Sequence, residues 1–144
     1  YRAKRNVPGT AYDRDERATH QRAKTLQKYP TTWLTAELAI VAAEGLIAAA
    51  TDREWIILRA AVMSNHVHVV VAECPDGGSA VRRALKGVSQ AALNAYVGKP
   101  GSWWTRGGSD RYLHGERAIA AAVNYVARQR GMLVGVENNL IVMG

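Results

Sequence analysis

Two histidines separated by a single valine are the residues of this chain best suited to chemistry. His66 and His68 lie in the stretch Val62–Val71, which is rich in the β-branched residues typical of a strand. Because side chains alternate along a strand, both imidazoles are expected on one face, with Cα atoms roughly 6–7 Å apart. Two imidazoles at this spacing can reach one metal ion, whereas in an apolar core their ring nitrogens would need hydrogen-bond partners.

A tyrosine and a glutamine further along the chain extend this chemistry. The apolar spacing from Glu116 to Arg130 predicts a helix, ended by Gly131 as a C-cap, on which Tyr125 and Gln129 share one face. Two imidazoles and an amide oxygen form an open three-ligand set for Mg²⁺ or Mn²⁺, whereas zinc more often recruits Cys or a carboxylate. The tyrosine could then attack a phosphorus that the metal polarises. Taken singly, Tyr125 also fits a tyrosine at the edge of the core, and Gln129 a surface residue.

The sequence patterns around these side chains predict the helices and strands of an α+β fold. Thr35 is suited to cap a helix whose apolar spacing runs to about Ala50. Two β-branched runs joined by the short connection 63–65 predict an antiparallel pair, and the tail 132–144 predicts a short strand or extended segment. The expected fold is an antiparallel sheet with helices packed on it, with helices over 35–50, 79–96 and 116–130 and strands over 55–62 and 66–73.

The net charge of +7 is concentrated in one part of the 144-residue chain. Residues 82–130 hold nine Lys and Arg against two acidic residues, so the remainder is balanced. A polyanionic partner is one explanation, and a solvated basic surface is another. Arg82, Arg83 and Lys86 crowd one side of the expected second helix.

A tryptophan pair follows that helix. Trp103 and Trp104 stand close to Arg106, Arg111 and a pair of glycines, a composition suited to base stacking and phosphate contact. Burial of one or both indoles in the core is the alternative.

Cysteine content and hydropathy indicate the cellular setting of the chain. Cys74 is the single cysteine, which excludes an internal disulfide and fits a cytoplasmic setting. No apolar run approaches the 18 residues that a membrane span requires, so no membrane partner is expected.

The two motifs together resemble a known family. Asn65-His66-Val67-His68, followed by valines, resembles the HUH motif (histidine, hydrophobic residue, histidine) of the single-tyrosine transposases. These include the insertion-sequence 200/605 transposases and the REP-associated tyrosine transposases. Tyr125-Val126-Ala127-Arg128-Gln129 resembles the nucleophile helix of that family, in which a metal-binding glutamine follows the tyrosine by four residues. The basic segment 103–112 is also similar, and the resemblance covers residues 34–130.

The resemblance implies a fold, an activity and a partner. The fold would be the ferredoxin-like or RRM-like sheet of HUH nucleases. The activity would be transposition by nicking and rejoining of single-stranded DNA beside a hairpin, through a 5′-phosphotyrosine on Tyr125 and a free 3′-OH, with Mg or Mn held by His66, His68 and Gln129. The setting would be cytoplasmic and nucleoid-associated, and several members of the family are homodimers. The expected DNA contacts are Arg82, Arg83, Lys86, Trp103, Trp104, Arg106, Arg111 and Arg128.

Two alternatives remain to be weighed. Members of the family usually begin with a β-strand, whereas residues 1–33 predict a basic N-terminal arm without one, ahead of a catalytic domain over 34–144. This departure favours a domesticated protein that binds hairpin DNA without cutting it. Histidine-triad nucleotide hydrolases carry a third alternating histidine, and here that position is Val70, so their nucleophile is missing.

Overall fold

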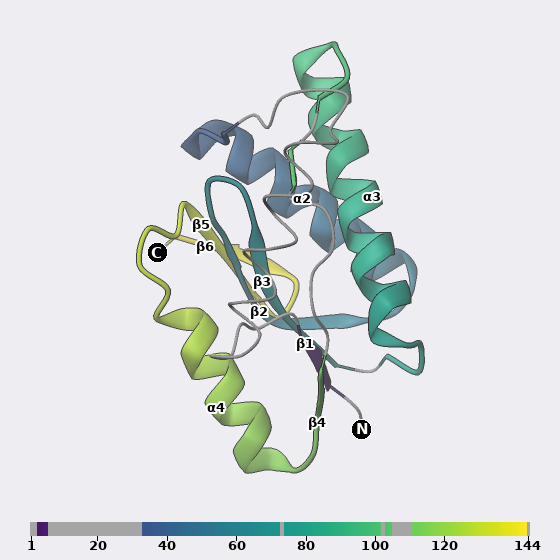
Figure 1. Ribbon diagram of the computed structural model, residues 1–144, viewed down its shortest axis with the longest axis vertical. Coiled ribbons are helices and arrows are strands. Elements are labelled where there is room, and N and C mark those ends of the chain that lie inside the picture. The colour runs from purple at the N-terminus through teal and green to yellow at the C-terminus, as the bar shows by residue number, and fades with distance from the viewer. Residues whose placement is uncertain (1–2, 6–32, 73, 102, 105–110, 144) are drawn as a thin grey trace, which may run out of the picture.

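A six-stranded antiparallel sheet lies at the centre of the computed structural model, which describes residues 3–5, 33–72, 74–101, 103–104 and 111–143 (Figure 1). The strand order is β4-β1-β3-β2-β5-β6. The elements in chain order are β1 (Ala3–Arg5), α2 (Ala36–Asp52), β2 (Ile56–Val62), β3 (Val67–Ala72), α3 (Gly78–Val97), β4 (Arg111–Leu113), α4 (Glu116–Ala127), β5 (Val134–Glu137) and β6 (Leu140–Val142). The α+β class and the antiparallel pairing of β2 with β3 are therefore confirmed.

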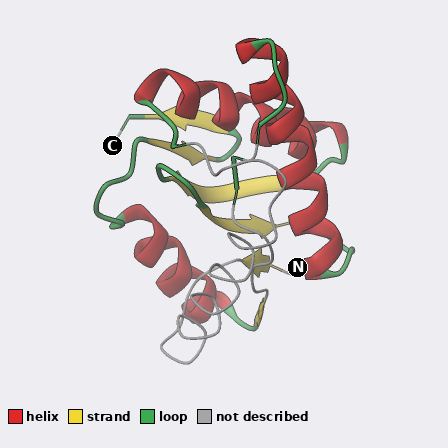
Figure 2. Ribbon diagram, turned by 45° about the horizontal axis from the view of Figure 1, so that its top comes forward, coloured by secondary structure: helices red, strands yellow, loops and turns green. Residues whose placement is uncertain are grey.

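Helices cover both faces of the sheet, with α2 and α3 on one side and α4 on the other (Figure 2). The alternation of β3 sorts its side chains between these two cores. Val69 and Val71 pack in the core shared with α2 and α3, whereas Val70 packs in the core shared with α4. His66 and His68 have the parity of Val70, so they belong to the face that α4 covers.

The N-terminus of α2 forms as the sequence predicts. Thr35 is the N-cap, and its Oγ1 accepts a hydrogen bond from the backbone N–H of Leu38 at 3.3 Å. Near the same end of the helix, the Tyr96 hydroxyl on α3 donates to the Glu37 carboxylate on α2. This hydrogen bond, together with the carboxylate charge, raises the pKa of Tyr96 above its ordinary value.

A glycine sets how closely α2 approaches α3. A Cβ at Gly45 would lie 2.9 Å from the Ser89 Cα, which is backbone and cannot move aside without separating the helices. Gly45→Ala is therefore expected to lower the free energy of unfolding by about 1–3 kcal/mol through overpacking. Gly87→Ala is the matched control, because that exposed glycine of α3 has no heavy atom within 4 Å of the added Cβ. It should raise stability by up to about 1 kcal/mol through helix propensity. Urea unfolding of both variants measures these changes. An equal increase in the free energy of unfolding in both variants would contradict the prediction of overpacking at Gly45.

The first strand corrects the expectation for residues 1–33. Ala3–Arg5 forms β1, which pairs with β3 through Lys4 and Val71 and with β4 through Ala3 and Leu113. Three mostly basic residues carry no apolar alternation, so the pattern that predicts strands could not detect β1. Residues 6–32 of the predicted arm lie outside the described residues.

The tail forms a hairpin rather than a single extended segment. β5 and β6 are joined by Asn138 and Asn139, whose φ values of 52° and 62° are those of a tight primed hairpin turn. The Asn139 side chain then extends the pairing, because its Oδ1 accepts from the Ile57 N–H at 2.7 Å and its Nδ2 donates to the Trp55 carbonyl at 3.0 Å.

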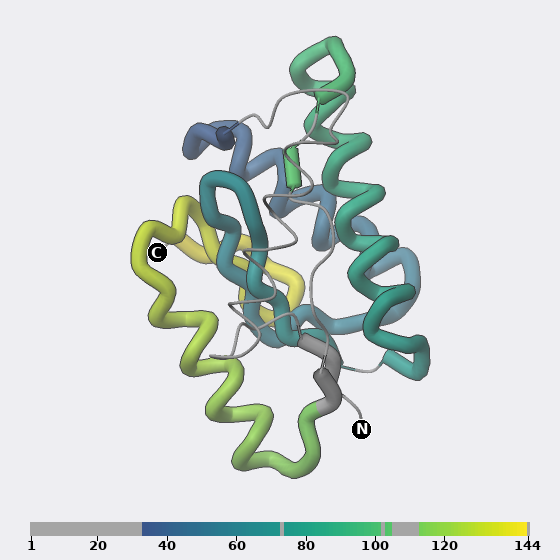
Figure 3. The backbone as a smooth tube through the Cα atoms, in the orientation of Figure 1, coloured from purple at the N-terminus to yellow at the C-terminus, as the bar shows by residue number. Residues whose placement is uncertain are grey.

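Helix α4 ends earlier than predicted. Its last residue is Ala127, and the backbone N–H of Arg128 closes the helix on the Asn124 carbonyl. The expectation of a C-cap at Gly131 is therefore wrong. Arg128, Gln129 and Arg130 are good helix formers, so propensity gave no stop signal. The chain instead turns back to the sheet, where the Leu133 N–H donates to the Val62 carbonyl at 2.9 Å (Figure 3).

Candidate active site

The first histidine lies in the tight connection between β2 and β3, one residue before β3 begins at Val67. Two backbone hydrogen bonds hold this connection. The Met63 N–H donates to the His66 carbonyl at 2.8 Å, and the Leu34 N–H donates to the Ser64 carbonyl at 2.7 Å. The histidine pair is therefore carried by a turn anchored both within the hairpin and to the segment ahead of α2.

The two imidazoles face each other through their Nε2 atoms. His66 Nε2 and His68 Nε2 lie 3.2 Å apart, and the rings are nearly perpendicular with centroids 4.9 Å apart. Two nitrogens that bind one ion at about 2.0–2.1 Å, with roughly 90–109° between the bonds, lie roughly 2.8–3.4 Å apart. The observed spacing thus fits either one shared proton or one shared cation, and the prediction that both histidines face the same way is confirmed.

The other ring nitrogen of His66 has a partner that the sequence motif did not single out. His66 Nδ1 lies 2.9 Å from Asn65 Oδ1. The position of an asparagine directly before the first histidine was the available signal, because Asn and Asp in turns commonly hydrogen-bond to nearby groups.

Tyr125 lies beside the second histidine. Its ring centroid is 6.2 Å from that of His68, in an edge-to-face arrangement. The buried Ala122 and Val126 fix α4 against the sheet, while Tyr125 itself remains 42% exposed. A tyrosine that contacts a buried histidine and remains open to solvent can meet a large substrate.

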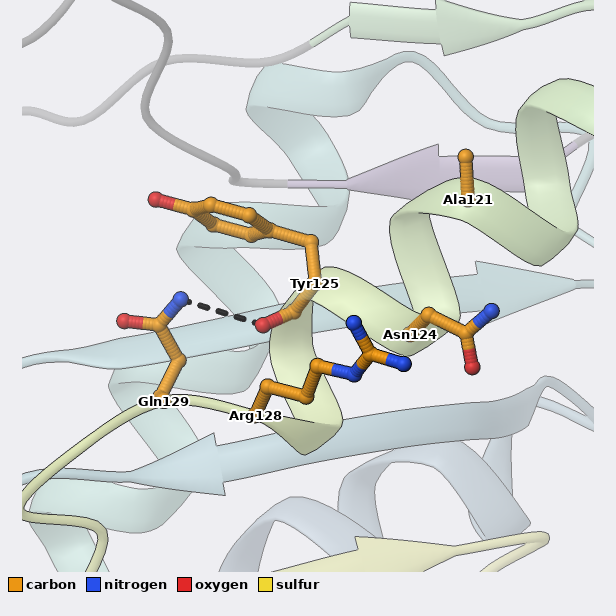
Figure 4. A pocket seen from close by; sticks show the side chains of 5 residues that line it. All are labelled: Ala121, Asn124, Tyr125, Arg128 and Gln129. Carbon is orange, nitrogen blue, oxygen red and sulfur yellow. Dashed lines mark hydrogen bonds between the residues drawn. The ribbon is translucent and has the colours of Figure 1, made fainter.

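A surface pocket of about 470 Å³ lies along the end of α4. Its lining residues are Ala121, Asn124, Tyr125, Arg128 and Gln129 (Figure 4). The side chains of Tyr125 and Gln129 extend to one side of the helix end, and those of Asn124 and Arg128 extend to the other. A cation, two amides and a phenol thus line one depression.

Gln129 lies just beyond the end of α4 rather than within the helix. Its Nε2 donates to the backbone carbonyl of Tyr125 at 3.1 Å, so the amide stabilises the helix C-terminus. Since a carbonyl only accepts, the amide nitrogen must take this bond, which leaves Oε1 at the opposite end of the amide group. The structure therefore groups Gln129 with Tyr125, and Tyr125 with His68.

Within the described part of the chain, no three His, Cys, Asp or Glu side chains form a cluster that could hold a metal ion. A cation at the histidine pair would take its remaining ligands from amide, water or substrate oxygens. Oxygen ligands of this kind suit Mg²⁺ and Mn²⁺.

The tryptophan pair corrects the prediction of a stacking surface. Trp103 and Trp104 are only 3% and 7% exposed, and both pack in the core with α2 and α3. Their indole N–H groups are also paired, with Asn94 Oδ1 at 2.8 Å and Ser89 Oγ at 2.9 Å. Buried, hydrogen-bonded indoles present no face on which a base could stack.

The predicted basic contacts fall into separate places. Arg128 lines the pocket beside Tyr125. Arg82, Arg83 and Lys86 lie on α3, which packs on the opposite face of the sheet from α4. Arg111 begins β4, but its side chain lies outside the described part of the structure, as does all of Arg106.

Comparison with protein-family models, with curated proteins and with solved structures found no match. Among the described residues, no helix is long and apolar enough to cross a membrane.

Proposed function

We propose that this protein is a metal-dependent transposase or endonuclease that nicks and rejoins single-stranded DNA through Tyr125. The observation that supports this most is the meeting of two distant segments. The histidine pair at the start of β3 and the tyrosine near the end of α4 are 57 residues apart in sequence, counted from His68, yet their rings are in contact. This is the combination that the two motifs predict.

The order of the elements also supports the proposal. The first six described elements run β-α-β-β-α-β, which is the order of ferredoxin-like folds. We propose the HUH nuclease arrangement of that fold, with His68 on the central strand β3, His66 directly before that strand and the tyrosine helix on the covering face. The absent first strand was the argument for a non-catalytic relic, and β1 removes that argument.

In the proposed reaction, the Tyr125 hydroxyl oxygen attacks a backbone phosphorus. A bond forms between that oxygen and phosphorus, the bond from phosphorus to the 3′-oxygen breaks, the phenol loses its proton and the 3′-oxygen gains one. The product is a 5′-phosphotyrosine and a free 3′-OH, and a second 3′-OH reverses the step without ATP.

His66 and His68 would hold the divalent cation, with the Gln129 amide oxygen as the third protein ligand. The cation would polarise the phosphoryl group and offset its charge. Arg128 is placed to contact a neighbouring phosphate, because it lines the same pocket as Tyr125.

A covalent-adduct assay tests the proposal. The full chain is incubated with a pool of end-labelled single-stranded hairpin DNAs and Mn²⁺, with and without EDTA, and run on a denaturing gel. A metal-dependent shifted band that mass spectrometry assigns to a peptide containing Tyr125 is expected. Salt-sensitive hairpin binding with no adduct across the pool would instead support the DNA-binding relic.

A further inference from the structure

The turn ahead of β3 places a hydrogen-bond acceptor, Asn65 Oδ1, beside the Nδ1 atom of His66. We propose that Asn65 is a positioning residue that holds His66 with its proton on Nδ1, so that the lone pair of His66 Nε2 points toward His68 Nε2. The inference rests on the proposed function only for the cation that would use this lone pair. The protonation pattern is a property of the protein alone.

Both ring nitrogens of His66 have a polar atom close by. Asn65 Oδ1 lies 2.9 Å from Nδ1, and a carboxamide oxygen only accepts hydrogen bonds. The proton of a neutral His66 therefore belongs on Nδ1. His66 Nε2 then accepts, and His68 Nε2, 3.2 Å away, is the donor across the gap in the metal-free protein.

This arrangement is the one that His66 needs as a metal ligand, whereas His68 would have to release its Nε2 proton when a cation binds both rings. A neutral imidazole binds a cation through its unprotonated nitrogen, and the hydrogen bond at its other nitrogen sets which nitrogen that is. Without the Asn65 acceptor, the proton of His66 could move to Nε2 and occupy the position between the two rings. Loss of such an outer hydrogen bond typically weakens metal binding by about 10- to 100-fold.

The backbone of the turn does not itself explain the asparagine. Among the described residues, the non-glycine positions with positive φ are Glu54, Asn138 and Asn139, so Asn65 adopts a conformation open to other residues. The turn is closed by backbone bonds of Met63 and Ser64, which need no side chain at position 65. The contact that distinguishes Asn65 is thus the one its amide makes with His66.

The test compares Asn65→Leu, which removes the acceptor, with Asn65→Asp, which keeps one. Ser64→Ala is the matched control, because it alters the same turn and leaves the Asn65 amide in place. Long-range ¹H–¹⁵N NMR of the metal-free full chain at pH 8, where ordinary histidines are neutral, reports which nitrogen of His66 carries the proton. Calorimetric titration with Mn²⁺ alone reports the affinity.

Wild type, Ser64→Ala and Asn65→Asp should show the proton on Nδ1, and Asn65→Leu should lose that preference and bind Mn²⁺ about 10- to 100-fold more weakly. Amide spectra of β2 and β3 confirm that each variant is folded. A wild-type His66 with its proton on Nε2, or an unchanged ring and affinity in Asn65→Leu, would overturn the proposal. Because the NMR experiment contains neither metal nor DNA, a failed adduct assay would leave this result standing, and the reverse also holds.

Discussion

Tyr125→Phe is expected to abolish the covalent protein–DNA adduct while hairpin binding persists. The substitution removes the single oxygen that the proposed reaction joins to phosphorus, and enzymes that lose their nucleophile typically slow by at least about 1,000-fold. The phenyl ring still packs against His68, so the fold of α4 is retained. Binding should change by less than about tenfold, because one hydrogen bond contributes about 0.5–1.5 kcal/mol.

Tyr96→Phe supplies the matched control for this experiment. Tyr96 is also an exposed helical tyrosine, at 54% against 42% for Tyr125, but it lies on α3 beside Glu37. It should form the adduct at the wild-type rate. Denaturing gels measure the adduct and fluorescence anisotropy measures binding. An adduct that survives in Tyr125→Phe would exclude this residue as the nucleophile, and joint loss of adduct and binding would assign it a structural role.

His68→Leu is expected to weaken Mn²⁺ binding by at least about 100-fold. The substitution removes a proposed metal ligand itself, whereas Asn65→Leu removes only a hydrogen bond to such a ligand. Leucine is chosen because His68 is only 5% exposed and sits opposite Ala61 on β2, so alanine would leave a cavity. Strand cleavage should fall with the metal affinity. Calorimetry with Mn²⁺ measures the first effect, and the adduct assay measures the second.

His114→Leu controls for the general loss of an imidazole. His114 is exposed in the connection between β4 and α4, and the variant should bind Mn²⁺ as wild type does. Thermal unfolding of His68→Leu checks that the sheet remains intact. Unchanged Mn²⁺ affinity in a folded His68→Leu protein would remove this histidine from the ligand set.

The parts of the structure that the sequence predicted are those set by local periodicity. The alternation around His68 placed the histidine pair on one face, and the apolar spacing of 116–127 predicted the helix that carries Tyr125. The N-cap at Thr35 follows the same local logic. Each of these depends on residues only a few positions apart.

The parts that were missed depend on partners far along the chain. β1 is a strand only because β3 and β4 provide backbone partners on both sides. Trp103 and Trp104 are buried because α3 supplies Asn94 and Ser89 to their indole nitrogens. The basic and glycine-rich residues near the two tryptophans indicated an exposed surface, but packing and hydrogen bonds to distant residues bury both indoles.

The hydrogen bond from Leu34 to Ser64 links the histidine turn to the opposite side of the sheet. Leu34 is buried in the core that α2 and α3 share, while the turn presents its histidines on the α4 side. Opening of the turn therefore breaks its hydrogen bond to a residue packed behind the sheet. Each opening of the turn exposes the Leu34 amide to exchange, so the hydrogen-exchange rate of this amide sets an upper limit on how often the turn that carries the histidines opens.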